Sequence, residues 1–204
     1  MSGEHQLCVS CISQLDETFS ASQEDNSTER RLMGKVPYES AMSLYRFHHN
    51  NKVQAVVHAM KFHGNDALCR MMGRQMGLSL VASGRFDDVD VLVPVPLHWY
   101  RWLQRGYNQS ELLCRGIAEV MPRPVVTRAV VRKRYTKKQS LQIGTERLGN
   151  VEGAFSTRKP SLLAGKHVLL VDDVLTTGAT IATCADALAV VPDIKISVAT
   201  LCIV

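Results

Sequence analysis

The sequence predicts an α/β protein: an open, mostly parallel sheet flanked by helices, preceded by a small N-terminal appendage. Residues 168–171 are all apolar, which is typical of a strand buried on both faces. From residue 90 onward, strand and helix patterns alternate in an order close to β-α-β-β-α-β, which favours a parallel sheet. The 204 residues are 46% hydrophobic and 21% charged, so one good core and a small appendage are expected.

The N-terminal residues 1–40 predict an appendage that resembles part of a zinc ribbon. Cys8 and Cys11 form a single Cys-x-x-Cys pair, whereas a closed structural zinc site needs four ligands. His5 supplies a third candidate and no fourth is evident, so zinc is the less favoured interpretation. Residues 16–31 are polar and lack a hydrophobic period, which predicts a flexible connector to a main domain at 41–204.

The first half of the main domain contains two predicted helices and a strand. Asn51 can cap a helix that ends near Gly64, and a second helix is expected over residues 67–81. Residues 90–97 form an apolar segment in which Pro94 and Pro96 mark the exit of a strand, because proline cannot donate to a sheet.

The second half predicts the remaining elements around a long basic loop. We expect a helix at 110–120, a strand at 124–131, a loop through residue 150 and a short strand at 153–157 that returns to the sheet. A helix at 181–190 and a strand at 195–204 follow.

Composition limits the classes of function. No apolar run approaches the ~20 residues of a membrane span, and residues 1–20 are too polar for a signal peptide, so we expect a cytoplasmic protein. The net charge of +5 is compatible with an acidic ligand or nucleic acid. Outside the Cys8 pair, the cysteines lie in apolar contexts and are expected to be buried thiols: Cys69, Cys114, Cys184 and Cys202.

The strand at 168–171 is followed by a pattern that suits a phosphorylated sugar. Asp172 and Asp173 come at its carboxyl end, where carboxylates can accept hydrogen bonds from sugar hydroxyls. A small, hydroxyl-rich turn then opens the next helix, whose free N–H groups and dipole favour an anion. The turn comprises Thr176, Thr177, Gly178, Ala179 and Thr180. The acids are adjacent, unlike the Asp-x-Asp of dehalogenase-type phosphatases, and no P-loop motif is present.

A second anion site is predicted where the strand at 90–97 ends. The exit turn leads into a basic, amide-bearing segment that contains Arg101, Arg105 and residues 107–109. The loop 132–150 is basic in its first part, and long loops of this kind inside a compact domain are usually functional or disordered.

The pattern Asp172-Asp173-x-x-Thr176-Thr177-Gly178-x-Thr180 after an apolar strand resembles the phosphoribosyl-pyrophosphate (PRPP) motif of type I phosphoribosyltransferases. The segments 92–98, 105–109 and 136–155, with the helical segment 58–64, resemble more specifically the competence protein F (ComF) family, which includes GntX-type proteins. Members of that family usually begin with two cysteine pairs, and Cys8 and Cys11 are similar to the second pair.

The resemblance implies a type I phosphoribosyltransferase fold that binds PRPP with Mg²⁺, possible transfer of the phosphoribosyl group, and a link to DNA uptake. Asp172 and Asp173 would bind the ribose hydroxyls, the turn 176–180 the 5-phosphate, and the strand exit the pyrophosphate. The pyrophosphate-facing residues would be Val95, Pro96, His98, Arg101 and Arg105, and the loop would close with Arg132, Lys137, Gln139 and Arg147 as catalytic candidates.

Two other functions remain open from the sequence. The chain could be a non-catalytic adaptor that handles single-stranded DNA, with a competence helicase as partner, since its basic loop and net charge suit phosphate contacts. It could also sense PRPP or a nucleotide without turnover. No residue is identifiable as a general base, and the acceptor substrate cannot be read from the sequence.

Overall fold

A computed structural model describes residue 7 and residues 9–49, 51–62, 65–97, 103, 105–132 and 154–204. Within these ranges, the helices are α1 (Val9–Ile12), α2 (Ser27–Leu32), α3 (Lys52–Phe62), α4 (Asp66–Ser83), α6 (Gln109–Ala118) and α7 (Ala179–Leu188), with 3₁₀ turns η1 (Ser20–Ser22) and η3 (Pro160–Leu162). The strands are β1 (Ala41–Arg46), β2 (Val91–Pro94), β3 (Val130–Arg132), β4 (Phe155–Thr157), β5 (His167–Leu175) and β6 (Lys195–Ile203).

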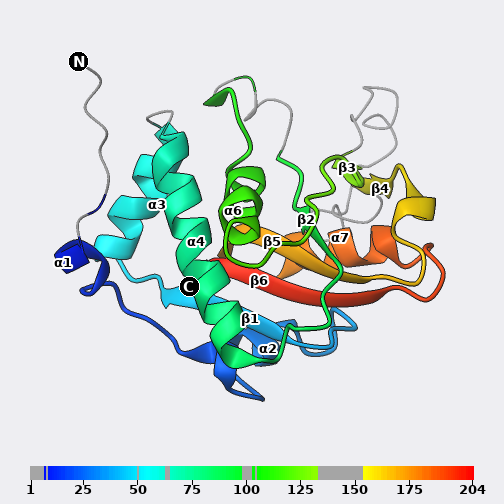
Figure 1. Ribbon diagram of the computed structural model, residues 1–204, viewed down its shortest axis with the longest axis horizontal. Helices are drawn as coiled ribbons and strands as arrows, with labels where there is room; N and C mark the ends of the chain where they lie inside the picture. The colour runs from blue at the N-terminus through cyan, green and yellow to red at the C-terminus, as the bar shows by residue number, and fades with distance from the viewer. Residues whose placement is uncertain are drawn as a thin grey trace, which may run out of the picture.

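A four-stranded parallel sheet in the order β1-β6-β5-β2 forms the centre of the molecule (Figure 1). The predicted α/β class with a mostly parallel sheet is confirmed. Because every pair in this sheet is parallel, the carboxyl ends of the four strands meet at one edge. Side chains from the loops that follow these strands can therefore converge there.

The two faces of β5 pack into separate hydrophobic clusters. Leu169 and Val171 contact the cluster formed with α3, α4 and α6, whereas Val168 and Leu170 contact the cluster that includes α7. All four side chains are fully buried. This arrangement explains the continuous apolar run, because a strand with helices on both faces needs no polar alternation.

Helices α4 and α6 lie in very close contact on the face of the sheet to which Leu169 and Val171 point (Figure 1). A Cβ atom added to Gly116 would lie 2.2 Å from the carbonyl oxygen of Arg70, and one added to Gly73 would lie 2.3 Å from that of Leu113. The two backbones can approach this closely only because both positions are glycine. The contact fixes α6, whose first turn carries residues of the candidate site.

The prediction of a flexible connector at residues 16–31 was wrong. Asn26 forms a capping box with Glu29 at the start of α2, and its side-chain amide also donates to the carbonyl oxygens of Ser20, Gln23 and Ala41. The buried carboxylate of Glu29 contacts Arg85 at 2.6 Å. This segment is held by side-chain hydrogen bonds rather than by an apolar stripe, so a search for hydrophobic periodicity misses it.

Two strand predictions also need correction, and one strand was missed. Strand β1 was not predicted, because its sequence includes a buried serine and does not alternate. The strand expected at 124–131 is divided by a turn into one bridge between Val125 and Leu92 and the short strand β3. The strand expected at 153–157 corresponds to β4, which pairs with β3 in a separate two-stranded sheet instead of returning to the main one.

Within the described residues, we find no helix with the length and apolar character needed to cross a membrane. The four cysteines predicted to be buried are buried: Cys69, Cys114, Cys184 and Cys202. Burial is the main cause that raises the pKa of the Cys69 and Cys202 thiols to about 12.

Candidate functional site

The acidic pair lies inside a strand rather than after it. Strand β5 continues to Leu175 and remains paired with β6, but its pairing with β2 ends where Val171 faces Pro94. The amide of Val95 donates one more hydrogen bond to the carbonyl oxygen of Val171 at 2.9 Å. Asp172 and Asp173 therefore occupy a rigid strand at the point where the neighbouring strand has ended and left one side open.

The carboxylate of Asp172 is held by α6. Its Oδ1 atom accepts hydrogen bonds from the Ser110 hydroxyl at 3.0 Å and from the backbone amide of Asp173 at 2.9 Å. Burial, together with the negative charge of Asp173, raises the pKa of Asp172 to about 7. Asp172 can consequently take up or release a proton near neutral pH.

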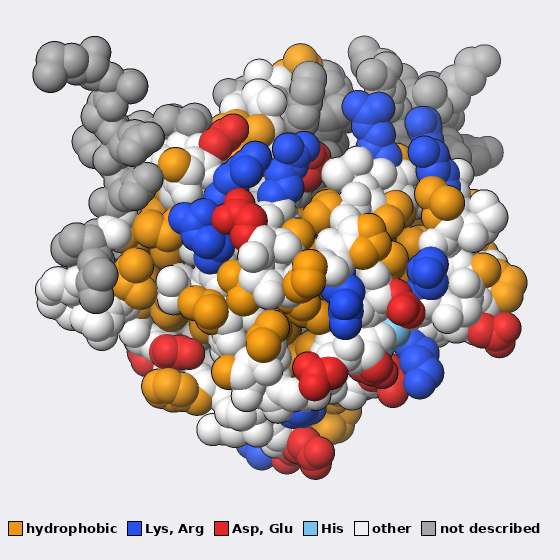
Figure 2. All heavy atoms as spheres, in the orientation of Figure 1, with side chains coloured by type: hydrophobic (Ala, Val, Ile, Leu, Met, Phe, Trp, Pro, Cys, Tyr) orange, Lys and Arg blue, Asp and Glu red, His pale blue; other side chains and the backbone are white. Residues whose placement is uncertain are grey.

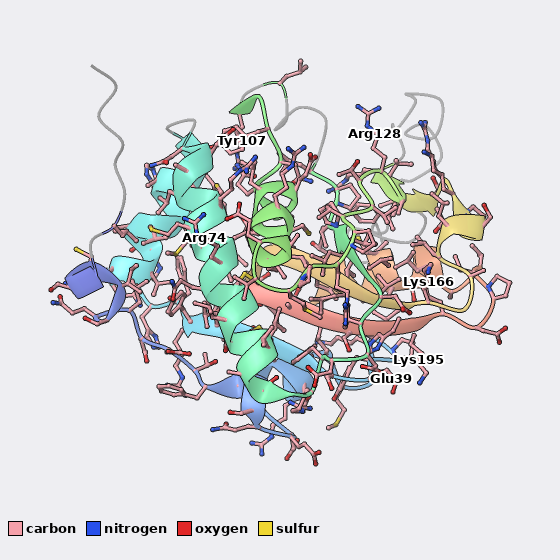
Figure 3. All side chains as sticks on the ribbon, in the orientation of Figure 1. Glu39, Arg74, Tyr107, Arg128, Lys166 and Lys195 are labelled. Atoms are coloured by element: carbon pink, nitrogen blue, oxygen red, sulfur yellow. The ribbon has the colours of Figure 1, made fainter. Side chains whose placement is uncertain are left out.

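A lysine from helix α3 completes the charged cluster. Lys61 Nζ lies 3.1 Å from Asp173 Oδ2, and both side chains are largely buried. The end of α3, which carries Lys61, is held in place through the preceding residue, Met60. The carbonyl oxygen of Met60 accepts hydrogen bonds from the Tyr107 hydroxyl at 2.6 Å and from the Gln109 amide at 3.4 Å. Tyr107, labelled in Figure 3, lies just before α6.

The segment 105–109 therefore has a clear structural role. Asn108 caps α6 by accepting from the amide of Ser110, and its own amide group donates to the carbonyl oxygen of Val95 at 3.0 Å. One side chain thus links the start of α6 to the exit of β2. Arg105 reaches the first turn of the helix, where it donates to Gln109 at 3.2 Å.

Thr176, Thr177 and Gly178 form the turn between β5 and α7, here called the phosphate loop. Gly178 is the N-cap of α7 with φ +84°, a conformation that favours glycine. A Cβ atom at this position would also lie 3.0 Å from Leu32 Cδ2. The turn therefore needs glycine for two reasons, and it aims the amino end of a ten-residue helix at the edge of the sheet.

These elements enclose a cavity of about 370 Å³ at the carboxyl ends of the strands. Its lining combines the acidic pair, three cationic side chains and several hydrogen-bonding groups. The lining residues are Lys61, Val95, Pro96, Leu97, Arg105, Asn108, Gln109, Ser110, Arg132, Asp172, Asp173, Val174, Thr176 and Thr180. A cavity that brings two carboxylates together with three cationic side chains suits a ligand that carries both hydroxyl and phosphate groups.

Most of the predicted site residues that the structure describes meet in this cavity. The acidic pair, Thr176 and Thr180 lie with Val95, Pro96 and Arg105, which come from a segment about 70 positions earlier in the chain. Arg132 also lines the cavity, and its guanidinium lies 5.3 Å from the centre of the Phe155 ring. The remaining predicted residues, Thr177 and Gly178 in the turn and Ala179 at the start of α7, lie in sequence between Thr176 and Thr180. His98, Arg101, Lys137, Gln139 and Arg147 lie outside the described residues.

Sequence reasoning missed Lys61 and Ser110. The segment 58–64 was recognised only as part of a family resemblance, and Ser110 only as the start of a helix. Nothing local marks either residue as part of a site, because each reaches the acids through tertiary packing. A lysine at the end of a helix normally faces solvent, whereas Lys61 is 23% exposed and paired with Asp173.

The donor set fits Mg²⁺ that arrives with a phosphate ligand. Among the lining residues, Asp172 and Asp173 are the carboxylates, and the described part of the chain holds no cluster of three or more His, Cys, Asp or Glu side chains. Mg²⁺ commonly takes one or two carboxylates and completes its shell with water and substrate phosphates. Cys8, half of the candidate zinc pair, lies outside the described residues, so the zinc prediction stays open.

Comparison with known proteins places these residues in a wider group. The family model described as "Phosphoribosyl transferase domain" matches residues 108–202, which include α6, the acidic pair and the phosphate loop. Lys61 and α2 lie outside the matched segment.

Three curated relatives show the same likeness. The DNA utilization protein YhgH of Salmonella typhi is 31% identical over 162 residues, which cover 78% of this chain and 70% of that protein. YhgH of Escherichia coli K12 is 32% identical over 136 residues, or 65% of this chain. Competence protein F of Haemophilus influenzae is 28% identical over 138 residues, or 66% of this chain. The match covers only 59% and 60% of these last two proteins.

Proposed function

Because the chain belongs to the competence protein F (ComF) family of phosphoribosyltransferase-like proteins, we propose that its cavity binds PRPP with Mg²⁺, or another ligand that carries ribose 5-phosphate. The observation that carries this proposal is the meeting of the acidic pair and the phosphate loop at one cavity. Adjacent carboxylates accept hydrogen bonds from the two ribose hydroxyls, and the start of α7 binds the 5-phosphate.

Each part of the ligand has a matching group in the proposal. Asp172 and Asp173 bind the ribose, while Thr176, Thr180 and the loop amides bind the 5-phosphate. Arg105 and the turn at Val95–Pro96 face the pyrophosphate. Mg²⁺, when bound, supplies positive charge to the pyrophosphate oxygens. Lys61 balances the charge of the acidic pair before the ligand arrives, and its ammonium is then close enough to contact ligand phosphates.

Transfer of the phosphoribosyl group is the reaction that this arrangement would support. Breaking the bond between ribose C1 and pyrophosphate places positive charge on the sugar and negative charge on the leaving group. In the proposed complex the carboxylates lie beside the sugar, and the cations Lys61, Arg105 and Arg132 come from the lining of the same cavity. The residues would therefore act by positioning and by electrostatic stabilisation. The acceptor that attacks C1 is not assigned.

The second candidate is an adaptor that handles single-stranded DNA on the same fold. Two observations favour it: relatives of this chain are named for DNA utilization and competence, and the chain carries a net charge of +5. On the face seen in Figure 2, however, basic and acidic side chains are mixed over α4 and α6. Arg70 and Arg74 both contact Glu119, and Arg115 contacts Glu111. These ion pairs reduce the positive potential that this face would offer to DNA phosphates.

Thermal unfolding with two ligands separates the candidates. We expect PRPP with Mg²⁺ to raise the melting temperature, since a ligand at a hundredfold excess over its Kd adds ~2.7 kcal/mol of stability. A shift with single-stranded DNA alone that disappears at high salt would favour the adaptor instead. No shift with millimolar PRPP and Mg²⁺ would contradict the proposal. Release of pyrophosphate in the presence of candidate bases would then test turnover.

A further inference from the structure

Two basic side chains from the N-terminal segment reach the phosphate loop. Arg31, in α2, donates through Nη1 to the carbonyl oxygen of Thr176 and through Nη2 to that of Val204 at 2.8 Å. Lys35, in the turn that follows α2, donates to the carbonyl oxygen of Thr177 at 2.8 Å and to that of Arg31 at 3.1 Å. Two successive carbonyl groups of the loop are thus held by cations that lie more than 140 positions earlier in the chain.

Between these two contacts, α2 also packs directly against the loop. The side chain of Leu32 is fully buried, and its Cδ2 atom lies 3.0 Å from the point where a Cβ atom of Gly178 would be. Arg31, Leu32 and Lys35 therefore form one surface beneath the loop, here called the loop support. The capping box of Asn26 and Glu29 fixes this surface at the other end of α2.

The geometry of the peptide bond gives these contacts a consequence for ligand binding. In a planar trans peptide, the carbonyl oxygen and the N–H of the next residue point in opposite directions, and the described peptide bonds include no cis form. When Arg31 holds the Thr176 carbonyl, the amide of Thr177 must point away from Arg31. When Lys35 holds the Thr177 carbonyl, the amide of Gly178 is turned away from Lys35 in the same manner.

We infer that Arg31 and Lys35 are positioning residues that fix the phosphate loop with its amides turned toward the ligand. They hold the orientation before the ligand arrives, so binding does not have to order the loop. The inference rests on the proposed function for the identity of the ligand, which is a phosphomonoester such as that of ribose 5-phosphate. It also gives the N-terminal segment a role in the site, although this segment lies outside the matched phosphoribosyltransferase region.

The test compares Arg31→Met, Lys35→Met and the double variant with Arg30→Met. Arg30 is the matched control because it is adjacent to Arg31 but pairs with Asp25 on the exposed side of α2, at 2.8 Å. Backbone ¹⁵N relaxation of residues 177 and 178, measured without ligand, reports the order of the loop directly. We expect the order parameter of these amides to fall from about 0.85 to below about 0.6 in the double variant, while the control and the melting temperature change little.

Binding of two partial ligands gives the second readout. The affinity for ribose 5-phosphate is expected to fall about tenfold in the double variant, since two charge-assisted hydrogen bonds that order the loop are lost. The affinity for Mg²⁺-pyrophosphate is expected to stay within about twofold, because that group is assigned to the other side of the cavity. Arg31→Lys, which keeps the positive charge but carries its donors on a single nitrogen, should restore part of the loss.

The outcomes distinguish the two proposals. Unchanged order parameters at residues 177 and 178 in the double variant would overturn the inference, whatever the parent protein binds. Equal losses of ribose 5-phosphate and pyrophosphate affinity would also overturn it, since they would indicate general damage. If the loop loses order in the double variant but the parent protein binds no ribose 5-phosphate, Arg31 and Lys35 do fix the loop and the proposed function is contradicted.

Discussion

The ammonium group of Lys61 lies 3.1 Å from Asp173 Oδ2, although the two residues are separated by more than a hundred positions in the chain. The hydrogen bonds from Tyr107 and Gln109 to Met60 hold the end of α3 where this contact forms. Asp172 and Asp173 are adjacent carboxylates in a mostly buried place, and a nearby cation lowers the free energy of their charged forms. Lys61 therefore belongs to the site electrostatically as well as spatially.

Replacement of Lys61 by methionine should raise the pKa of Asp172 above its value of about 7, because the positive charge of Lys61 is one of the influences that lower it. Carboxylate titration followed by ¹³C NMR measures this pKa directly. Lys52→Met, on the same helix but away from the acids, is the control and should leave the titration unchanged. A midpoint that stays at its original pH in Lys61→Met would show that the two groups are not coupled.

Asp172→Asn should remove the part of the pH dependence of the unfolding free energy that comes from the raised pKa of Asp172. The pKa of Asp172 is about 7 in the folded protein, against an ordinary value of 3.8. Between these values the folded state holds a proton that the unfolded state has released, so the free energy of unfolding falls as pH rises from about 4 to about 7. Asparagine should therefore stabilise the protein at pH 8 by on the order of 2 kcal/mol and have little effect at pH 4.

Urea unfolding of parent and variant at these two pH values measures the effect of Asp172→Asn. Asp186→Asn, at an exposed position of α7, should change neither value. If the parent and Asp172→Asn lose stability in parallel over this range, another group must be responsible for the pH dependence.

Gly178→Ala should destabilise the protein more than Gly165→Ala. Both glycines have positive φ, so alanine is strained at each by about 1 kcal/mol. Only at Gly178 would the new Cβ atom also meet Leu32, whereas nothing lies within 4 Å at Gly165. The difference in unfolding free energy between the two variants isolates the contact with α2. Equal costs would mean that α2 moves away from the loop freely.

Gly116→Ala should reverse the usual effect of alanine in a helix. Alanine normally stabilises a helix interior by ~1 kcal/mol relative to glycine. At Gly116 its Cβ atom would lie 2.2 Å from the carbonyl oxygen of Arg70, so α4 and α6 must separate, at a cost of roughly 2 kcal/mol or more. Gly77→Ala, with its nearest atom at 3.0 Å, should cost less. Thermal unfolding ranks the two, and the opposite order would contradict the packing described.

The sequence was sufficient for features that depend on local chemistry. Leu169 and Val171 belong to a run that only a strand covered on both faces explains, and Asp172, Asp173 and the phosphate loop follow it without interruption. The approach of Val95, Pro96 and Arg105 to these acids could be expected because parallel strands end at one edge.

Features held by contacts between distant residues could not be predicted in the same way. Lys61 and Ser110 reach the acids through the packing of α3 and α6, for which no local pattern exists. The N-terminal segment looked flexible because its stability comes from hydrogen bonds of Asn26 and Glu29. Its contact with the phosphate loop through Arg31 is visible only once both ends of the chain are placed.

Calorimetric titration of the parent protein and Asp173→Ala with PRPP and Mg²⁺ is the most direct test of the central claim. We expect the parent to bind and the variant to lose at least about a hundredfold in affinity, since a carboxylate proposed to accept hydrogen bonds from the ribose hydroxyls is removed. Circular dichroism should meanwhile show that the variant is folded at the titration temperature, because removal of Asp173 leaves the mostly buried Lys61 without its ion-pair partner and lowers the free energy of unfolding. Equal affinity of the two proteins, or no binding by either, would contradict the account.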